Sequence, residues 1–186
     1  MSKIKEYAQK TYHFIFKEDS VLSWIVNIIL AFLLVKFVIY PLLALILGSS
    51  LPLVAVISGS MEHNGMDFDT WWDANGAWYE QENISKDMFS TYKFTNGFDK
   101  GDVMILGRSG TVSIGDVLVY QSDTHPYPII HRVMYINEDG SYIIKGDNND
   151  GPDPAPVQPS QVLGKALYRI PKIGWIKIWF SELTGL

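Results

Sequence analysis

The stretch DVLVYQSDTHPYPIIHRVMYINEDGSYIIKG, residues 116–146, decides the fold class of this chain. It contains three runs of β-branched and aromatic residues, which Gly, Pro, Asp and Asn separate from one another. Such runs are typical of short β-strands, and the brief polar segments between them favour antiparallel pairing. The stretch therefore predicts strands at 116–120, 128–136 and 141–146.

Two runs upstream have the same character, LVAVI at 53–57 and DVMIL at 102–106. Several short strands with little helix between them predict a mainly β domain with an antiparallel, barrel-like sheet. The segment 62–99 differs, because it is aromatic, acidic and poor in aliphatic strand formers. We interpret it as an insertion with one short helix at 84–92, and we expect its aromatic residues to pack against the domain or the membrane surface.

Ahead of the β domain lies an apolar run from Val21 to Leu47 with a single charge, Lys36. A helix of this length spans about 40 Å, more than the ~30 Å hydrocarbon core of a bilayer. The run is longer than the ~7–15 apolar residues of a cleavable signal sequence, and it lacks the polar stripe of a buried core helix. We predict a transmembrane anchor at 21–48, with a kink or an end of the regular helix at Pro41.

The distribution of basic residues predicts the orientation of this anchor. Residues 1–20 carry four lysines, and no Lys or Arg follows the anchor until Lys86. The positive-inside rule then places 1–20 in the cytoplasm and the β domain, 49–186, outside the cell membrane. The apolar C-terminal segment, 170–186, either closes the β domain or lies in the membrane interface.

Composition excludes several classes of function. The 186 residues suffice for one domain of ordinary size plus an anchor. A net charge of -5 without an arginine-rich run disfavours nucleic acid as a partner. The chain has no cysteine, which excludes disulfides and thiol catalysis, and its four histidines lack zinc-ligand spacing. We therefore predict no metal and no cofactor.

The chain offers one set of residues for nucleophilic catalysis. A hydroxyl nucleophile needs a base, and the base needs an orienting acid. Ser60 follows an apolar strand in the small-residue turn 58–61, and His131 interrupts the apolar strand at 128–136. An imidazole in that place needs a polar partner. Three aspartates follow the next strand, in the loop KGDNNDGPDP at 145–154, which adjacent strands would bring close to His131.

Each of these signals also has a structural explanation when it is taken alone. A Ser-Gly-Ser sequence is usually a turn, a strand histidine is usually structural, and an Asp/Asn/Gly loop is usually solvated. The loop could also bind calcium, although Gly151 sits one position early for an EF-hand and the downstream Glu is missing. A membrane-anchored calcium- or surface-binding domain and a catalytically silent peptide-binding β module therefore stay open as alternatives.

Five motifs in order behind one anchor resemble the type I signal peptidases, and more closely their archaeal and endoplasmic-reticulum branch. They are ISGSME at 57–62, KGDVMIL at 100–106, GDVLVY at 115–120, PIIHRVM at 128–134 and KGDNNDGPDP at 145–154. The resemblance implies a membrane-bound serine endopeptidase that removes N-terminal signal peptides from exported preproteins. It also implies the lipid bilayer as a partner, with the translocation machinery as a candidate partner.

The resemblance implies a role for each matching residue. Ser60 matches the nucleophile, and His131 matches the general base that replaces the lysine of the bacterial branch. Asp147 and Asp153 match the two aspartates of the last motif, of which the second is implicated in the catalytic centre. Ser58 matches a position whose hydroxyl contributes to the oxyanion hole, together with the backbone amide of Ser60.

The chain departs from the family pattern at three places. His63 stands where the family usually has proline, and the insertion at 62–99 is unusually long. The proline-rich run after Gly151 leaves the register of Asp153 open, with Asp150 as the alternative.

Overall fold

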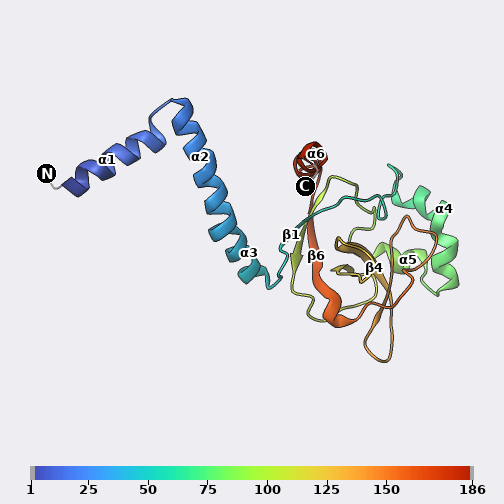
Figure 1. The fold of residues 1–186 in the computed structure, drawn as a ribbon. Helices are drawn as coiled ribbons and strands as arrows, with labels where there is room; N and C mark the ends of the chain where they lie inside the picture. Colours follow the sequence, from blue (N-terminus) through green and yellow to red (C-terminus); the bar gives the residue numbers. More distant parts are fainter. Residues whose placement is uncertain (1–2, 185–186) are drawn as a thin grey trace. The chain divides into compact units, whose positions relative to one another are not determined.

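The computed structural model describes residues 3–184 and divides into two compact units, one ending at Ile46 and the other beginning at Leu47. The first unit is helical (Figure 1). Its elements are α1 (Lys3–Phe16), α2 (Val21–Leu34), a π-helical segment (Val35–Ile39) and α3 (Tyr40–Leu47).

The apolar helix is continuous from Val21 to Leu47, and within residues 3–184 it is the one helix long and apolar enough to cross a membrane. The Ser20 hydroxyl caps its start by accepting a hydrogen bond from the Ser23 amide. We predicted that the regular helix either kinks or ends at Pro41, and it does not end there. Instead the hydrogen bonding widens to a π-helical pattern just before the proline, which has no N–H to donate.

The second unit is built on a six-stranded antiparallel sheet with the order β1-β2-β6-β3-β4-β5. Its strands are β1 (Leu53–Ala55), β2 (Val103–Gly107), β3 (Val117–Tyr120), β4 (Ile129–Ile136), β5 (Tyr142–Lys145) and β6 (Val162–Ile170). In the described part of the chain the sheet is open, with β1 and β5 at its edges. The prediction of a mainly β, antiparallel domain behind one apolar N-terminal helix is confirmed.

The sequence interpretation missed β6, which has nine residues and lies between β2 and β3. Its sequence, VLGKALYRI, has few β-branched residues and contains a glycine. The neighbours explain both features, because β6 is paired on its two sides and passes close to other backbone. A Cβ on Gly164 would lie 3.0 Å from the carbonyl oxygen of Gly107 on β2.

The insertion contains two helices rather than the single short one predicted. They are α4 (Phe68–Gln81) and α5 (Lys86–Ser90), capped by Asp67 and Ser85. Their buried aromatic residues form one cluster with Met134 of β4: Trp71, Trp72, Tyr79 and Phe89. The aromatic residues therefore pack against the β domain, one of the two expected places.

The C-terminal helix α6 (Trp175–Thr184) also packs on the β domain through one side (Figure 1). Ile178 is only 6% exposed, and the Lys100 ammonium lies 5.5 Å from the centroid of the Trp175 ring. Trp179 and Phe180 are 60% and 63% exposed. The segment thus contributes to the β domain, and its contact with a membrane interface stays a prediction.

Candidate active site

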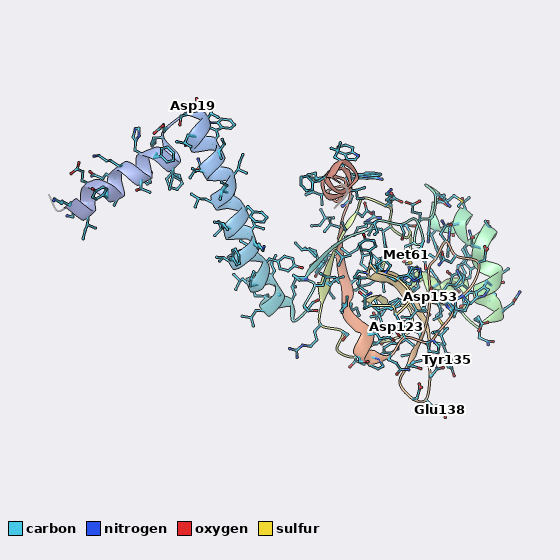
Figure 2. The ribbon with its side chains drawn as sticks, in the orientation of Figure 1. Asp19, Met61, Asp123, Tyr135, Glu138 and Asp153 are labelled. Carbon is cyan, nitrogen blue, oxygen red and sulfur yellow. The ribbon has the colours of Figure 1, made fainter. Side chains whose placement is uncertain are left out.

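Ser60 lies in a tight turn after β1. The hydrophobic core fixes this turn through the residue that follows Ser60. Met61, the next residue, is fully buried in the main hydrophobic cluster, and its carbonyl oxygen accepts a hydrogen bond from the Phe98 amide at 3.0 Å. Figure 2 labels Met61 within the β domain. With Met61 turned inward, Ser60 stays partly accessible, and its hydroxyl oxygen lies 3.2 Å from that of Ser58. Both serines line a groove of about 280 Å³.

His131 enters the same groove from β4. The residue is 6% exposed, and its Nδ1 lies 2.7 Å from Oδ2 of Asp153. An ionised carboxylate can only accept hydrogen bonds, so Nδ1 carries the proton and Nε2 keeps a free lone pair. The backbone amide of Asp153 donates to the carbonyl oxygen of Ile144 at 2.8 Å, which ties this part of the loop to β5.

The acidic loop, residues 145–154, contacts both the serine turn, residues 58–61, and His131. A Cβ on Gly146 would lie 2.6 Å from the Ser60 carbonyl oxygen and 2.9 Å from Nε2 of His131, so the Gly146 backbone contacts both residues. The backbone amide of Asn148 donates to the Ser60 carbonyl oxygen at 2.8 Å. The side-chain amide of Asn148 donates to the Gly59 carbonyl oxygen at 3.0 Å. Nε2 of His131 therefore lies beside the serine turn.

Asp147 belongs to a separate network on the other side of β4. Arg132 follows His131 by one residue, and successive side chains of a strand point to opposite faces. Arg132 is fully buried and binds Asp147 with two hydrogen bonds, from Nε to Oδ1 at 2.9 Å and from Nη2 to Oδ2 at 2.7 Å. Burial alone would raise the pKa of Asp147, but the guanidinium outweighs it and lowers the pKa to about 2.

The structure thus separates the three aspartates that the sequence left as alternatives. Asp153 contacts His131, whereas Asp147 pairs with Arg132 and Asp150 is exposed. The alternation of β4 side chains explains the division between two of them, since Asp153 pairs with His131 on one face of the strand and Asp147 pairs with Arg132 on the other.

Sequence reasoning missed two residues next to Asp147. His63, the substitution for the family proline, is 2% exposed, with Nε2 3.3 Å from Oδ2 of Asp147. Its ring stacks on Trp71 of α4 at a centroid distance of 3.9 Å. Arg132 was a charge inside an apolar strand, a signal that could have predicted a buried ion pair. The insertion is thereby connected to the acidic loop through His63.

Lys145 is a further missed residue, at the end of β5. It is 2% exposed, and its ammonium group donates to the Tyr79 hydroxyl at 3.2 Å and to the Gly146 carbonyl oxygen at 3.0 Å. Burial lowers the pKa of Lys145 to about 8. The lysine therefore links α4 of the insertion to Gly146, whose backbone contacts both Ser60 and His131.

The arrangement combines a hydroxyl group and an imidazole that line one groove with a carboxylate that contacts Nδ1 of that imidazole. Such a set can transfer an acyl group through a serine nucleophile and a histidine base. Within residues 3–184, no group of three or more His, Asp or Glu side chains could hold a metal ion.

The chain is similar to catalytic subunits of the signal peptidase complex, named SEC11. It is 30% identical over 172 residues to the subunit of Plasmodium falciparum (isolate 3D7), which covers 87% of this chain and 75% of that protein. It is 28% identical over 161 residues to that of Lachancea thermotolerans, covering 78% and 76% of the two chains. For Saccharomyces cerevisiae (strain YJM789) the identity is 28% over 153 residues, covering 75% and 72%. No family model matches the chain.

Proposed function

Because the chain belongs to the SEC11-type signal peptidases, the Ser/His branch of the type I enzymes, we propose that Ser60 and His131 perform its peptide cleavage. Members of this family are serine endopeptidases that remove signal peptides, and this chain is such a hydrolase. The observation that supports the residue assignment is that His131, which contacts Asp153 at 2.7 Å, lines the same groove as Ser60.

In the proposed first step, Ser60 attacks the carbonyl carbon of the last leader residue while Nε2 of His131 takes the hydroxyl proton. Asp153 stabilises the imidazolium ion that forms, and the imidazolium then donates the proton to the leaving amine. A water molecule, activated by the same imidazole, hydrolyses the acyl-enzyme in the second step. The charge on the carbonyl oxygen would be stabilised by the Ser60 amide and the Ser58 hydroxyl, and one such donor contributes about 3–4 kcal/mol.

The groove suits an extended peptide with small side chains. It is lined on one side by apolar residues of β1 and the segment after it, Val54, Ala55 and Ile57. Since β1 is an edge strand, a leader peptide can pair with it as an added strand. The apolar lining of this groove would contact the small side chains before the cleavage site.

We also propose that 21–48 anchors the enzyme in the membrane, with 1–20 cytoplasmic and the catalytic domain, 49–186, outside the cytoplasm. The lysine distribution supports this orientation. Single cysteines introduced at Ser2 and Ser109 of the cysteine-free chain can be labelled from either side of the membrane. Labelling of Ser2→Cys from outside would contradict the orientation.

Signal peptides and the lipid bilayer are the partners that this function requires. The relatives are named as subunits of a complex, which makes partner subunits a further proposal for this chain. The translocation machinery, which delivers the substrate, is the other proposed partner.

Preprotein cleavage by the full-length chain in detergent tests the proposal. We expect Ser60→Ala to abolish cleavage and Ser113→Ala, a change at an exposed serine, to leave it unchanged. Equal cleavage by Ser60→Ala and the wild type would refute the serine-protease mechanism and favour a silent peptide-binding module.

A further inference from the structure

The side chains of Tyr120 and His131 form hydrogen bonds to the same carboxylate oxygen. Its hydroxyl donates to Oδ2 of Asp153 at 2.6 Å, and Nδ1 of His131 lies 2.7 Å from that oxygen. Tyr120 as a whole residue is only 3% exposed. One carboxylate oxygen therefore receives two hydrogen bonds, one from β3 and one from β4.

The pairing of β3 with β4 produces this convergence. Leu118 lies opposite His131, and Tyr120 lies opposite Ile129. Tyr120 is thus two residues beyond the partner of His131, on the same face of the sheet and diagonal to it. Diagonal neighbours on adjacent strands are within reach of long aromatic side chains, and here both side chains meet at Asp153.

We propose that Tyr120 is a positioning residue of the catalytic centre, which holds Asp153 in place and limits how strongly that carboxylate attracts the proton of His131. The proposal rests on the proposed Ser60/His131 mechanism. The resemblance to signal peptidases assigned roles to the serine, the histidine and the aspartates, and none to this tyrosine.

The chemistry of the hydroxyl supports the positioning role. Burial raises the pKa of Tyr120, and its hydrogen bond to Asp153 raises it further, so the phenol stays a donor over the working range of the enzyme. A carboxylate oxygen that already accepts a hydrogen bond from one donor interacts less strongly with a second donor. Without the hydroxyl, Asp153 would stabilise the imidazolium form of His131 more strongly, so the base would lose its proton only at a higher pH.

Several other groups face this carboxylate. Lys145 on β5 interacts electrostatically with Asp153. Asp123 and His125 line a second cavity of about 630 Å³ together with Tyr120, His131 and Asp153. Tyr120→Phe removes only the phenolic oxygen and changes none of these groups, so it isolates the contribution of the hydroxyl.

The first test compares the pH dependence of preprotein cleavage by the wild type and Tyr120→Phe, both as full-length chains in detergent. We expect kcat to fall about 10-fold, as for a lost hydrogen bond to a charged group. The acid limb of the kcat/KM profile should move up by about 0.5–1 pH unit. KM should change little, because Tyr120 does not line the groove that holds Ser60. Tyr135→Phe, at a 59% exposed residue of β4, is the matched control and should behave as the wild type (Figure 2).

The second test is a double-mutant cycle with Asp153→Asn. If Tyr120 acts through Asp153, adding Tyr120→Phe to Asp153→Asn should lower kcat by less than twofold further. Additive losses, or a lower kcat with an unmoved acid limb, would overturn the proposal. A loss of activity that follows only a lower melting temperature would also overturn it, since a purely structural role predicts that outcome. Full activity of Asp153→Asn would instead show that the proposed mechanism itself fails.

Discussion

The backbone of Gly146 contacts both Ser60 and His131. Replacing this glycine by alanine would place a methyl group 2.6 Å from the Ser60 carbonyl oxygen, and backbone cannot easily move away. We expect Gly146→Ala to lower kcat/KM for preprotein cleavage about 100-fold or more, because a shift of about 1 Å in a catalytic group has that effect.

Gly151, in the same loop, offers a matched control. A Cβ there would meet no atom within 4 Å, so Gly151→Ala should cleave preprotein at the wild-type rate. Equal rates for both variants would show that the Gly146 contact is unimportant for catalysis.

The two aspartates of the last motif should separate into a kinetic and a structural residue. Asp153→Asn keeps the shape of the side chain but removes the charge that stabilises the imidazolium ion, so we expect kcat to fall about 10³–10⁴-fold with little change in unfolding free energy. Asp147→Asn leaves Arg132 as a buried cation without a charged partner, and it should lower the free energy of unfolding by about 3–5 kcal/mol.

Kinetics and denaturant unfolding of the two variants check this separation. Asp150→Asn, at an exposed position of the same loop, is the control for both measurements. A large kinetic defect confined to Asp150→Asn would mean that the family register was transferred wrongly to this chain.

At the scale of elements, β5 and α4 meet at a buried cation. The Lys145 ammonium lies 5.1 Å from the centroid of the Trp78 ring and 4.8 Å from that of Tyr79, both on α4. Its pKa is lowered by burial to about 8, against an ordinary value of 10.5 in an unfolded chain. Between these two pH values the unfolded chain binds a proton that the folded protein does not bind, so this lysine makes stability rise with pH.

We therefore expect the stability difference between the wild type and Lys145→Met to shift in favour of the wild type from pH 8 to pH 10.5. The change should approach about 3 kcal/mol, because each pKa unit corresponds to about 1.4 kcal/mol. Unfolding free energies measured across this range check the prediction. Lys93→Met, at an exposed lysine of the insertion, should give a flat difference, and a flat difference for Lys145→Met as well would contradict the lowered pKa.

The same scale shows where sequence patterns were sufficient and where they failed. The five predicted strands were found because each contains its own apolar run and is bounded by turn residues. β6 was missed because its pairing on both sides compensates for a sequence with few β-branched residues. Helix α4 was missed because aromatic residues fit strands and helices alike, although Asp67 is a helix-capping residue that could have indicated its start.

At the scale of the whole molecule, the apolar helix and the catalytic unit are separate compact bodies. Anchoring an enzyme in the membrane that holds its substrate raises the effective concentration of each for the other. We expect a chain that begins at Leu47 to cleave a short soluble leader peptide as the full chain does. Its cleavage of a membrane-inserted preprotein should fall about 100-fold.

Parallel assays of the two substrates in liposomes check this prediction, with Ser60→Ala of the shortened chain as the inactive control. Equal losses on both substrates would show that the helix stabilises the catalytic unit instead of concentrating the substrate.

The sequence by itself determined the mainly antiparallel β domain and the apolar N-terminal helix, and it singled out Ser60 and His131 as the candidate pair, because runs, turns and motifs are local features of the chain. Only the tertiary structure decided which aspartate meets His131. That choice depends on which face of β4 each side chain leaves and on how the loop after β5 passes it. The convergence of Tyr120 on Asp153 likewise depends on the register of β3 against β4, which no segment of the sequence specifies alone.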